Sequence, residues 1–230
     1  MNTRRWILWG VLLCGVGLGT SAWAQSAAKL AQQMKEAKDD KALLAARDAL
    51  VKMGGDGASA LDKTVLADAS APPNVRVNAA LGLAKLLEDS NGAFGTPELA
   101  KYAGDKNAGV RYVALKALIN PAARYAKAQG LLAEAAKDPA LPIRQMAVKS
   151  IEEQKGNPKL LAEMIVNPKE EREGKDEAER AFEALTPNKF GFTTAMKRDP
   201  ANPKSTVPVP DPDKEKEAIA KYEGWLKENK

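Results

Sequence analysis

Three arginines along this chain each follow an aspartate at a similar distance. A guanidinium forms charge-assisted, bidentate hydrogen bonds with a carboxylate or with a bound anion. The arginines are therefore either an anion-binding row or a structural ladder, in which buried or half-buried hydrogen bonds join each turn to its neighbour. Because bidentate bonds suit the joining of turns, we favour the ladder. Its expected members are Asp68 and Arg76, Asp105 and Arg111, and Asp138 and Arg144.

A second group of side chains lies on the helix face opposite the apolar stripe. Counted from each arginine as position zero, this face holds positions +1, +2, +5 and +9. Its lysines are expected to form a mildly basic ridge that contacts an acidic segment of another protein; the alternative is an ordinary solvated face. The ridge consists of Lys52, Lys85, Lys116 and Lys149, with Tyr112 and Met146 as apolar contacts. The candidate binding residues are Asn78, Lys85, Tyr112, Lys116, Gln145 and Lys149.

The sequence lacks the side chains on which many enzymes and metal sites depend. It contains no histidine, and its one cysteine, Cys14, lies in a leader segment. The absence of histidine removes the commonest general base, the usual hydrolase triads and imidazole metal ligands. Catalysis by carboxylates or lysines would need a concave, partly buried pair, and no spacing indicates one. We therefore expect a protein that is not an enzyme, with no catalytic residue, no cofactor and no metal site.

The arginines belong to a helical phrase that recurs about every 34 residues, a period typical of stacked two-helix units. An alanine follows each arginine at +3 and a large aliphatic residue at +7, as in Ala114 and Leu118 after Arg111. These positions share one face of an α-helix. Extension of the pattern to both ends gives anchors at positions 43, 76, 111, 144 and 178. A shorter helix precedes each longer one, and we expect five such pairs to stack on one core.

The first 24 residues have the features of an export signal. Arg4 and Arg5 precede an apolar run from Trp6 to Gly19, and Ala22-Trp23-Ala24 fits a cleavage site. We expect cleavage after Ala24 and a periplasmic or secreted protein; retention as an anchor is the alternative, and the secretory and twin-arginine routes both stay open. Loss of the leader lowers the formal net charge from +5 to +3. So small a charge, without a clustered basic stripe, argues against a nucleic-acid partner.

The composition changes after the last repeat. Five prolines within residues 188–213 predict an extended connector. Residues 214–230 then predict a helix with Asp213 as its N-cap. We expect this helix to fold back on the last repeats, with an exposed anchor for a partner as the alternative. Phe190-Gly191-Phe192 is expected to pin the connector; its alternative is a ligand clasp. The apolar stripe of the helix consists of Ile219, Tyr222, Trp225 and Leu226.

The repeated phrase resembles HEAT repeats, specifically the HEAT-like type named after phycobilisome lyases, over about residues 27 to 186. Units of that family carry an aspartate in the turn before the second helix and a Val-Arg pair that opens it, as in Asp105 and Val110-Arg111. Leu43 and Ala178 replace the arginine in the first and fifth units, and terminal repeats are often atypical. The tail resembles the ending of some bacterial exported HEAT-like proteins, which implies a bacterial source.

The resemblance implies an all-α fold, namely an α-solenoid: a superhelical array of about five HEAT-like helix pairs with a proline-rich connector and a C-terminal helix. Arrays of this type commonly present the candidate residues on their concave side. We therefore expect a monomeric, non-catalytic scaffold or adaptor that binds another protein, without nucleic acid and without a membrane after signal cleavage. The alternatives are a lyase-like or ligand-handling enzyme subunit and a purely structural envelope protein. The expected divisions are residues 1–24 (signal peptide), 25–187 (repeat solenoid), 188–213 (connector) and 214–230 (amphipathic helix).

Overall fold

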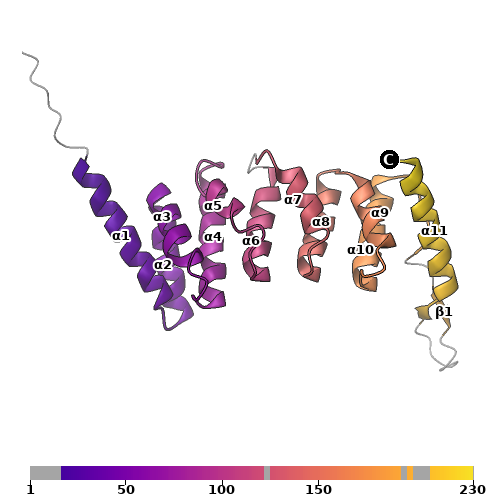
Figure 1. Cartoon of the computed structure of the whole chain (residues 1–230), viewed down its shortest axis with the longest axis horizontal. Helices are drawn as coiled ribbons and strands as arrows, with labels where there is room; N and C mark the ends of the chain where they lie inside the picture. The colour runs from indigo at the N-terminus through magenta and orange to yellow at the C-terminus, as the bar shows by residue number, and fades with distance from the viewer. Residues whose placement is uncertain (1–16, 122–124, 193–195, 199–207, 230) are drawn as a thin grey trace, which may run out of the picture. The chain divides into compact units, whose positions relative to one another are not determined.

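The computed structural model describes residues 17–121, 125–192, 196–198 and 208–229, and within these ranges the fold is all-α apart from one short strand pair (Figure 1). The chain divides into two compact units, residues 1–98 and 99–230, and each is described by itself. Most of the expected leader lies outside the described residues. Among the described helices, none is both long and apolar enough to cross a bilayer.

The first unit is built of successive helices, of which the second begins at a side-chain cap. The Asp39 carboxylate accepts a hydrogen bond of 2.8 Å from the backbone N–H of Ala42 and so caps the second helix. The first helix continues through Ala24, the residue after which cleavage is expected. The elements are α1 (Gly17–Lys35), α2 (Asp40–Lys52), α3 (Gly55–Ala60), the π-helical segment η1 (Leu61–Leu66) and α4 (Pro73–Asp89).

The core of the first unit lies where the predicted stripe of α2 meets its neighbours. Leu43 and Leu50 of α2 are buried, and so are Ala79 and Leu83 at the corresponding positions of α4. Helix α2 packs against α1, α3 and α4. A Cβ atom at Gly57 would lie 1.8 Å from the backbone oxygen of Leu50, so glycine is what allows α3 to approach α2 this closely.

The second unit continues the alternation of shorter and longer helices. Asn107 caps the first long helix, because its side-chain oxygen accepts hydrogen bonds from the backbone N–H groups of Gly109 and Val110. Asn157 caps a later short helix in the same way. The elements are α5 (Thr96–Ala100), which spans the division between the units, α6 (Ala108–Ile119), α7 (Ala128–Ala135), α8 (Leu141–Glu153), α9 (Pro158–Val166), α10 (Arg172–Leu185) and α11 (Pro212–Glu228).

One hydrophobic core runs through the second unit. Helix α8 packs against α6, α7 and α10, and α9 packs against α10 and α11. The repeated alanines Ala114, Ala147 and Ala178 are all 0% exposed. Because alanine is small, the long helices can approach closely while larger residues such as Leu118 and Ile151 fill the space one turn further on.

The proline-rich connector contains an element that the sequence did not predict. Strand β1 (Met196–Arg198) pairs with β2 (Pro208–Pro210) in an antiparallel ladder, with Lys197 opposite Val209. Pro208 and Pro210 have no backbone N–H, which keeps the ladder short. The following helix begins at Pro212 and its N-cap is Asp211, whose carboxylate accepts from the N–H of Asp213. The expectation of Asp213 as the cap was therefore wrong by two residues.

A buried carboxylate attaches the tail to the last repeat helix. Glu179 of α10 is 0% exposed, and its Oε1 accepts hydrogen bonds from the backbone N–H of Phe192 at 2.7 Å and from the Tyr222 hydroxyl at 2.9 Å. A buried carboxylate requires such donors. Burial, together with the nearby Glu179 charge, raises the pKa of the Tyr222 hydroxyl. Both donors follow α10 in sequence, so this carboxylate joins the connector and α11 to the repeat helices.

Aromatic rings surround this carboxylate. The Phe182 ring of α10 makes edge contacts with Tyr222 and Trp225, with centroids 5.1 and 4.9 Å apart. Phe190 makes a similar contact with Tyr222 at 4.7 Å. Such pairs add about 0.5–1.5 kcal/mol each beyond burial. Phe190 and Phe192 thus pin the connector, and α11 folds back on α9 and α10.

We predict that Tyr222→Phe lowers the free energy of unfolding by about 1–2 kcal/mol at neutral pH, because it removes a donor from a buried carboxylate. The raised pKa of Tyr222 contributes stability that is present below pH ~10, the value for an unfolded tyrosine, and is lost as the pH rises above it. The variant should therefore lose less stability between pH 7 and 10.5 than the parent.

Urea unfolding followed by Trp225 fluorescence measures this change in a chain that begins at Gln25, where Trp225 is the one tryptophan. Tyr125→Phe, at a partly exposed tyrosine, is the matched control and should change stability by less than about 0.5 kcal/mol. Equal losses in the two variants would contradict the role assigned to the Tyr222 hydroxyl.

Candidate functional site

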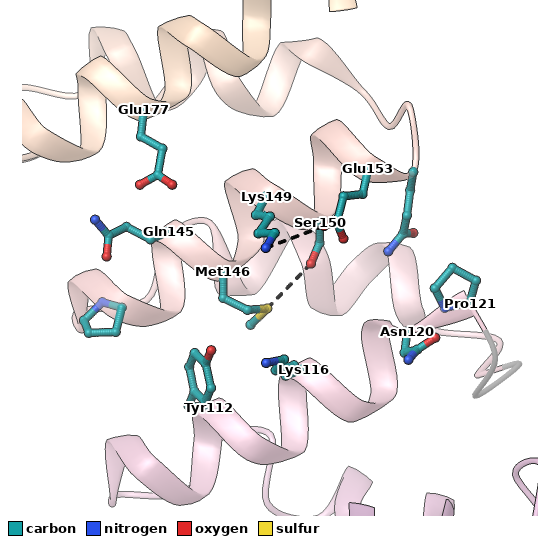
Figure 2. A pocket seen from close by; sticks show the side chains of 12 residues that line it. Tyr112, Lys116, Asn120, Pro121, Gln145, Met146, Lys149, Ser150, Glu153 and Glu177 are labelled. Carbon is teal, nitrogen blue, oxygen red and sulfur yellow. Dashed lines mark hydrogen bonds and ion pairs between the residues drawn. The ribbon is translucent and has the colours of Figure 1, made fainter. Parts of the chain in front are cut away.

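The second unit carries a groove of about 710 Å³ between its long helices. Side chains from α6, α8 and α10 line it, and the residues in Figure 2 point into the space between these helices. The volume lies within the range of ordinary small-molecule and cofactor sites. The principal lining residues are Tyr112, Lys116, Asn120, Gln145, Met146, Lys149, Glu153 and Glu177.

Helical spacing explains why these side chains line the same space. Tyr112 and Lys116 are four residues apart on α6, and Gln145 and Lys149 are four residues apart on α8. Residues separated by four positions lie on one face of a helix, one above the other. Because α6 and α8 pack side by side, the two series form adjacent walls of the groove.

Tyr112 and Met146 contribute apolar surface to the groove, together with Pro121 and Pro142. Met146 is 8% exposed, and its sulfur lies 3.7 Å from the Ser150 hydroxyl, which donates to it. The Nζ of Lys116 lies 5.6 Å from the centroid of the Tyr112 ring, a cation–π contact within one helix. A flat ring beside an adaptable thioether can accept apolar side chains of varied shape.

Charges of both signs line the groove. Lys149 and Glu153 are four residues apart on α8, with Nζ and Oε1 separated by 3.8 Å and with side chains 72% and 64% exposed. So exposed a pair contributes little to stability and can open at little cost. Lys116 from α6 and Glu177 from α10 add one charge of each sign. The groove is therefore mixed in charge, where the sequence predicted a basic ridge.

Two amide side chains of the groove are held by the fold. The Nε2 of Gln145 donates to Glu173 Oε1 of α10 at 3.0 Å, and the Nε2 of Gln154 donates to the carbonyl of Ile119 at 3.2 Å. These bonds connect α8 to α10 on one side and to the end of α6 on the other. The amides therefore help to fix the walls.

The six candidate binding residues are divided between the two units. Tyr112, Lys116, Gln145 and Lys149 line the groove, whereas the other two lie on α4 in the first unit. The Asn78 amide there donates to the carbonyl of Asn74 and accepts from Arg47. Lys85 pairs with Asp89 at 2.7 Å and with Glu88, and these carboxylates raise the pKa of its ammonium group. These contacts are local to α4, so Lys85 belongs to the first unit and is not part of the groove.

Each arginine of the predicted ladder in the second unit bridges two successive turns. The Nε and Nη2 of Arg111 donate to both carboxylate oxygens of Asp138 at 2.8 Å, and its Nη1 donates to the carbonyl of Asp105 at 2.7 Å. Burial of Asp138 opposes its ionisation, but the hydrogen bonds from Arg111 and Ala140 and the nearby positive charges outweigh it and lower the pKa of that carboxyl. The hydrogen bonds that Arg111 donates to Asp138 in turn raise the pKa of its guanidinium group.

Arg144 repeats this arrangement one unit later. Its Nη1 donates to the carbonyl of Asp138 at 2.9 Å, and its Nε pairs with the buried carboxylate of Glu170. A Cβ at Gly174 would lie 2.1 Å from Glu170 Oε1, so glycine leaves the space that this carboxylate occupies. The sequence did not identify Glu170. Glu170 follows Arg144 by 26 residues, and Asp138 follows Arg111 by 27. This similar spacing is the sequence signal that could have identified Glu170 as the partner of Arg144.

In the second unit, the expected pairing of Arg111 and Arg144 with the aspartate of the same turn needs correction. The structure uses the backbone carbonyl of that aspartate, and the carboxylate comes from the next turn. In the first unit, the Asp68 carboxylate binds Lys35 at 2.6 Å and Ser70, and these bonds lower its pKa. The Nη2 of Arg76 donates to the carbonyl of Leu66 at 3.1 Å.

The described residues contain no group of three or more carboxylate, histidine or cysteine side chains that could hold a metal ion. The groove contributes lysines, carboxylates, amides and an apolar surface. No family model and no curated protein sequence matches the chain. Among solved structures, an engineered protein determined by the Northeast Structural Genomics Consortium has a TM-score of 0.42 and 16% identity, and the match covers 91% of this chain and 93% of that one. A likeness of this degree assigns neither family nor function.

We predict that Arg111→Ala lowers the free energy of unfolding by about 3 kcal/mol, because it leaves the buried Asp138 carboxylate without its bidentate partner. Lys216→Ala, at an exposed position of α11, is the control and should change stability by less than about 0.5 kcal/mol. Chemical denaturation at pH 7 measures both variants. Indistinguishable unfolding midpoints would exclude a structural role for the arginine.

Proposed function

We propose that this protein is an exported, non-catalytic scaffold of the HEAT-like type that binds another protein through the groove of its second unit. Export is inferred from the leader in residues 1–24, and the repeat type from the recurring phrase around Arg76, Arg111 and Arg144. The groove is the observation that carries the binding function. It brings together four residues that the repeat pattern alone had selected as a binding face.

The proposed solenoid arrangement is supported by equivalent contacts in successive helix pairs. In the second unit, α6 packs on α8 and α8 packs on α10, with an alanine at 0% exposure in each of these helices. In the first unit, α2 packs on α4. Repetition of one contact is what a stacked array requires, since each pair covers the apolar stripe of the next.

The character of the groove favours a polypeptide partner over a small molecule that undergoes chemistry. Tyr112 and Met146 offer an apolar surface, and the exposed lysines and carboxylates beside them resemble the apolar centre and polar rim of protein interfaces. Lys116 and Lys149 supply the positive charges for acidic side chains of the partner. Such rim charges affect the rate and specificity of association more than its strength.

We predict that the double variant Lys116→Glu/Lys149→Glu reduces partner binding by roughly tenfold, since two attractive contacts become repulsive. The measurement is site-specific photocross-linking in the native envelope, with a benzoylphenylalanine at position 145 in the groove. A discrete cross-linked product is expected at this position, and the double variant should greatly weaken it.

Two controls make this experiment specific. Lys41→Glu/Lys63→Glu makes the same change in net charge at exposed positions of the first unit and should leave the cross-linked product intact. A benzoylphenylalanine at position 214, exposed on α11, should give no such product. Cross-linking that is equally strong from both positions, or unaffected by charge reversal in the groove, would refute the proposed binding surface.

A further inference from the structure

Two charged side chains of the groove have no ion pair among the described residues, and they carry opposite signs. The Nζ of Lys116 lies over the ring of Tyr112 on its own helix. Glu177 projects from α10 into the same space, above Gln145 in Figure 2. The remaining charged pair of the lining, Lys149 and Glu153, is joined loosely at 3.8 Å. Lys116 and Glu177 are thus the two charged groups of the lining that no ion pair among the described residues occupies.

These two groups stand on different walls. Lys116 belongs to α6 and Glu177 to α10, and α8 packs between these two helices and carries Met146. The α10 wall is acidic over a full turn, because Glu173 lies four residues before Glu177 and accepts from Gln145. The α6 wall presents a lysine above an aromatic ring. The groove is therefore positive on the α6 side and negative on the α10 side.

This arrangement selects against partners of a single sign. An entirely acidic segment would bring carboxylates toward Glu153 and Glu177, and an entirely basic one would bring ammonium groups toward Lys116 and Lys149. Like charges placed opposite one another oppose association. A segment with charges of both signs satisfies both walls, and an apolar side chain between them can rest on Tyr112 and Met146.

We infer that the groove recognises an extended polypeptide segment that carries charges of both signs around an apolar centre. Its acidic side chain lies on Lys116 and its basic side chain on Glu177. This inference rests on the proposed function, since it names the chemistry of the partner for the same groove. It also revises the expectation of a simply acidic partner, because Glu177 places a negative charge on the α10 wall.

Three synthetic peptides test the inference against the full-length protein by fluorescence anisotropy. All have blocked termini and a central Leu-Phe-Leu. The bipolar peptide has two glutamates on one side and two lysines on the other, the acidic peptide has glutamates on both sides, and the basic peptide has lysines on both sides. The bipolar peptide should bind about tenfold more tightly than either of the others. A difference of this size corresponds to the free energy of a few exposed ion pairs.

Charge variants assign the two ends of the peptide. Lys116→Glu and Glu177→Lys should each weaken binding of the bipolar peptide about threefold or more, and Glu177→Lys should shift the preference toward the acidic peptide. The double variant Lys116→Glu/Glu177→Lys exchanges the charges of the two walls. It should restore binding of the bipolar peptide, which would then lie in the groove with its chain direction reversed. Damage to the fold would give no such restoration. Lys41→Glu, on α2, is the control and should leave all three affinities unchanged.

The outcomes separate this inference from the function on which it rests. Equal or tighter binding of the acidic peptide, with a loss on Lys116→Glu, would overturn recognition of both signs and leave the groove as a protein-binding surface. Equal binding of all three peptides would likewise overturn it. Failure of every peptide to bind, together with no cross-link from position 145, would refute the proposed function and this inference together.

Discussion

The bond from each repeat arginine to the turn that follows is the constraint on which the second unit depends. Arg111 binds the Asp138 carboxylate ahead of α8, and Arg144 binds the Glu170 carboxylate ahead of α10. Each guanidinium also holds the carbonyl of its own turn. The positions of α6, α8 and α10 are thus constrained by guanidinium–carboxylate bonds, bidentate at Arg111 and through Nε alone at Arg144, as well as by apolar packing, and these are the three helices that line the groove.

A related constraint closes the end of the unit. Glu179 lies on α10, and its buried carboxylate takes one donor from the connector and one from α11. Helix α10 therefore has one face committed to the tail and another, with Glu173 and Glu177, turned toward α8 and the groove. The tail covers the last apolar stripe of the repeats, which has no further helix pair to cover it. The groove is left open on the other face.

The helical periodicity of the sequence predicted those features of the structure that depend on a single helix. The all-helical character was predicted correctly, and the alanines predicted for the stripe, such as Ala114 and Ala147, are fully buried. The i, i+4 rule also selected Tyr112, Lys116, Gln145 and Lys149, because residues on one face of each helix can be read from spacing alone.

Features that depend on two or more turns could not be predicted in this way. The carboxylate partner of each arginine comes from the following turn, so its identification required knowledge of which turns meet. Glu179 reads as one more surface glutamate in an acidic helix until the tail covers it. Glu177 likewise enters the groove only because α10 packs against α8. The local pair between Lys85 and Asp89, by contrast, was visible in the sequence as an i, i+4 spacing and was overlooked.

The distance between the α6 and α10 walls tests this account most directly. A chain beginning at Gln25 has no cysteine. Nitroxide spin labels attached at Lys116→Cys and Glu177→Cys therefore report this one distance when measured by pulsed electron–electron double resonance. With the arginines in place, we predict a single narrow distance distribution. Arg144→Ala should broaden or shift it while the chain stays helical by circular dichroism. An unchanged narrow distribution in that variant would contradict the claim that the arginine bonds hold the walls of the groove in position.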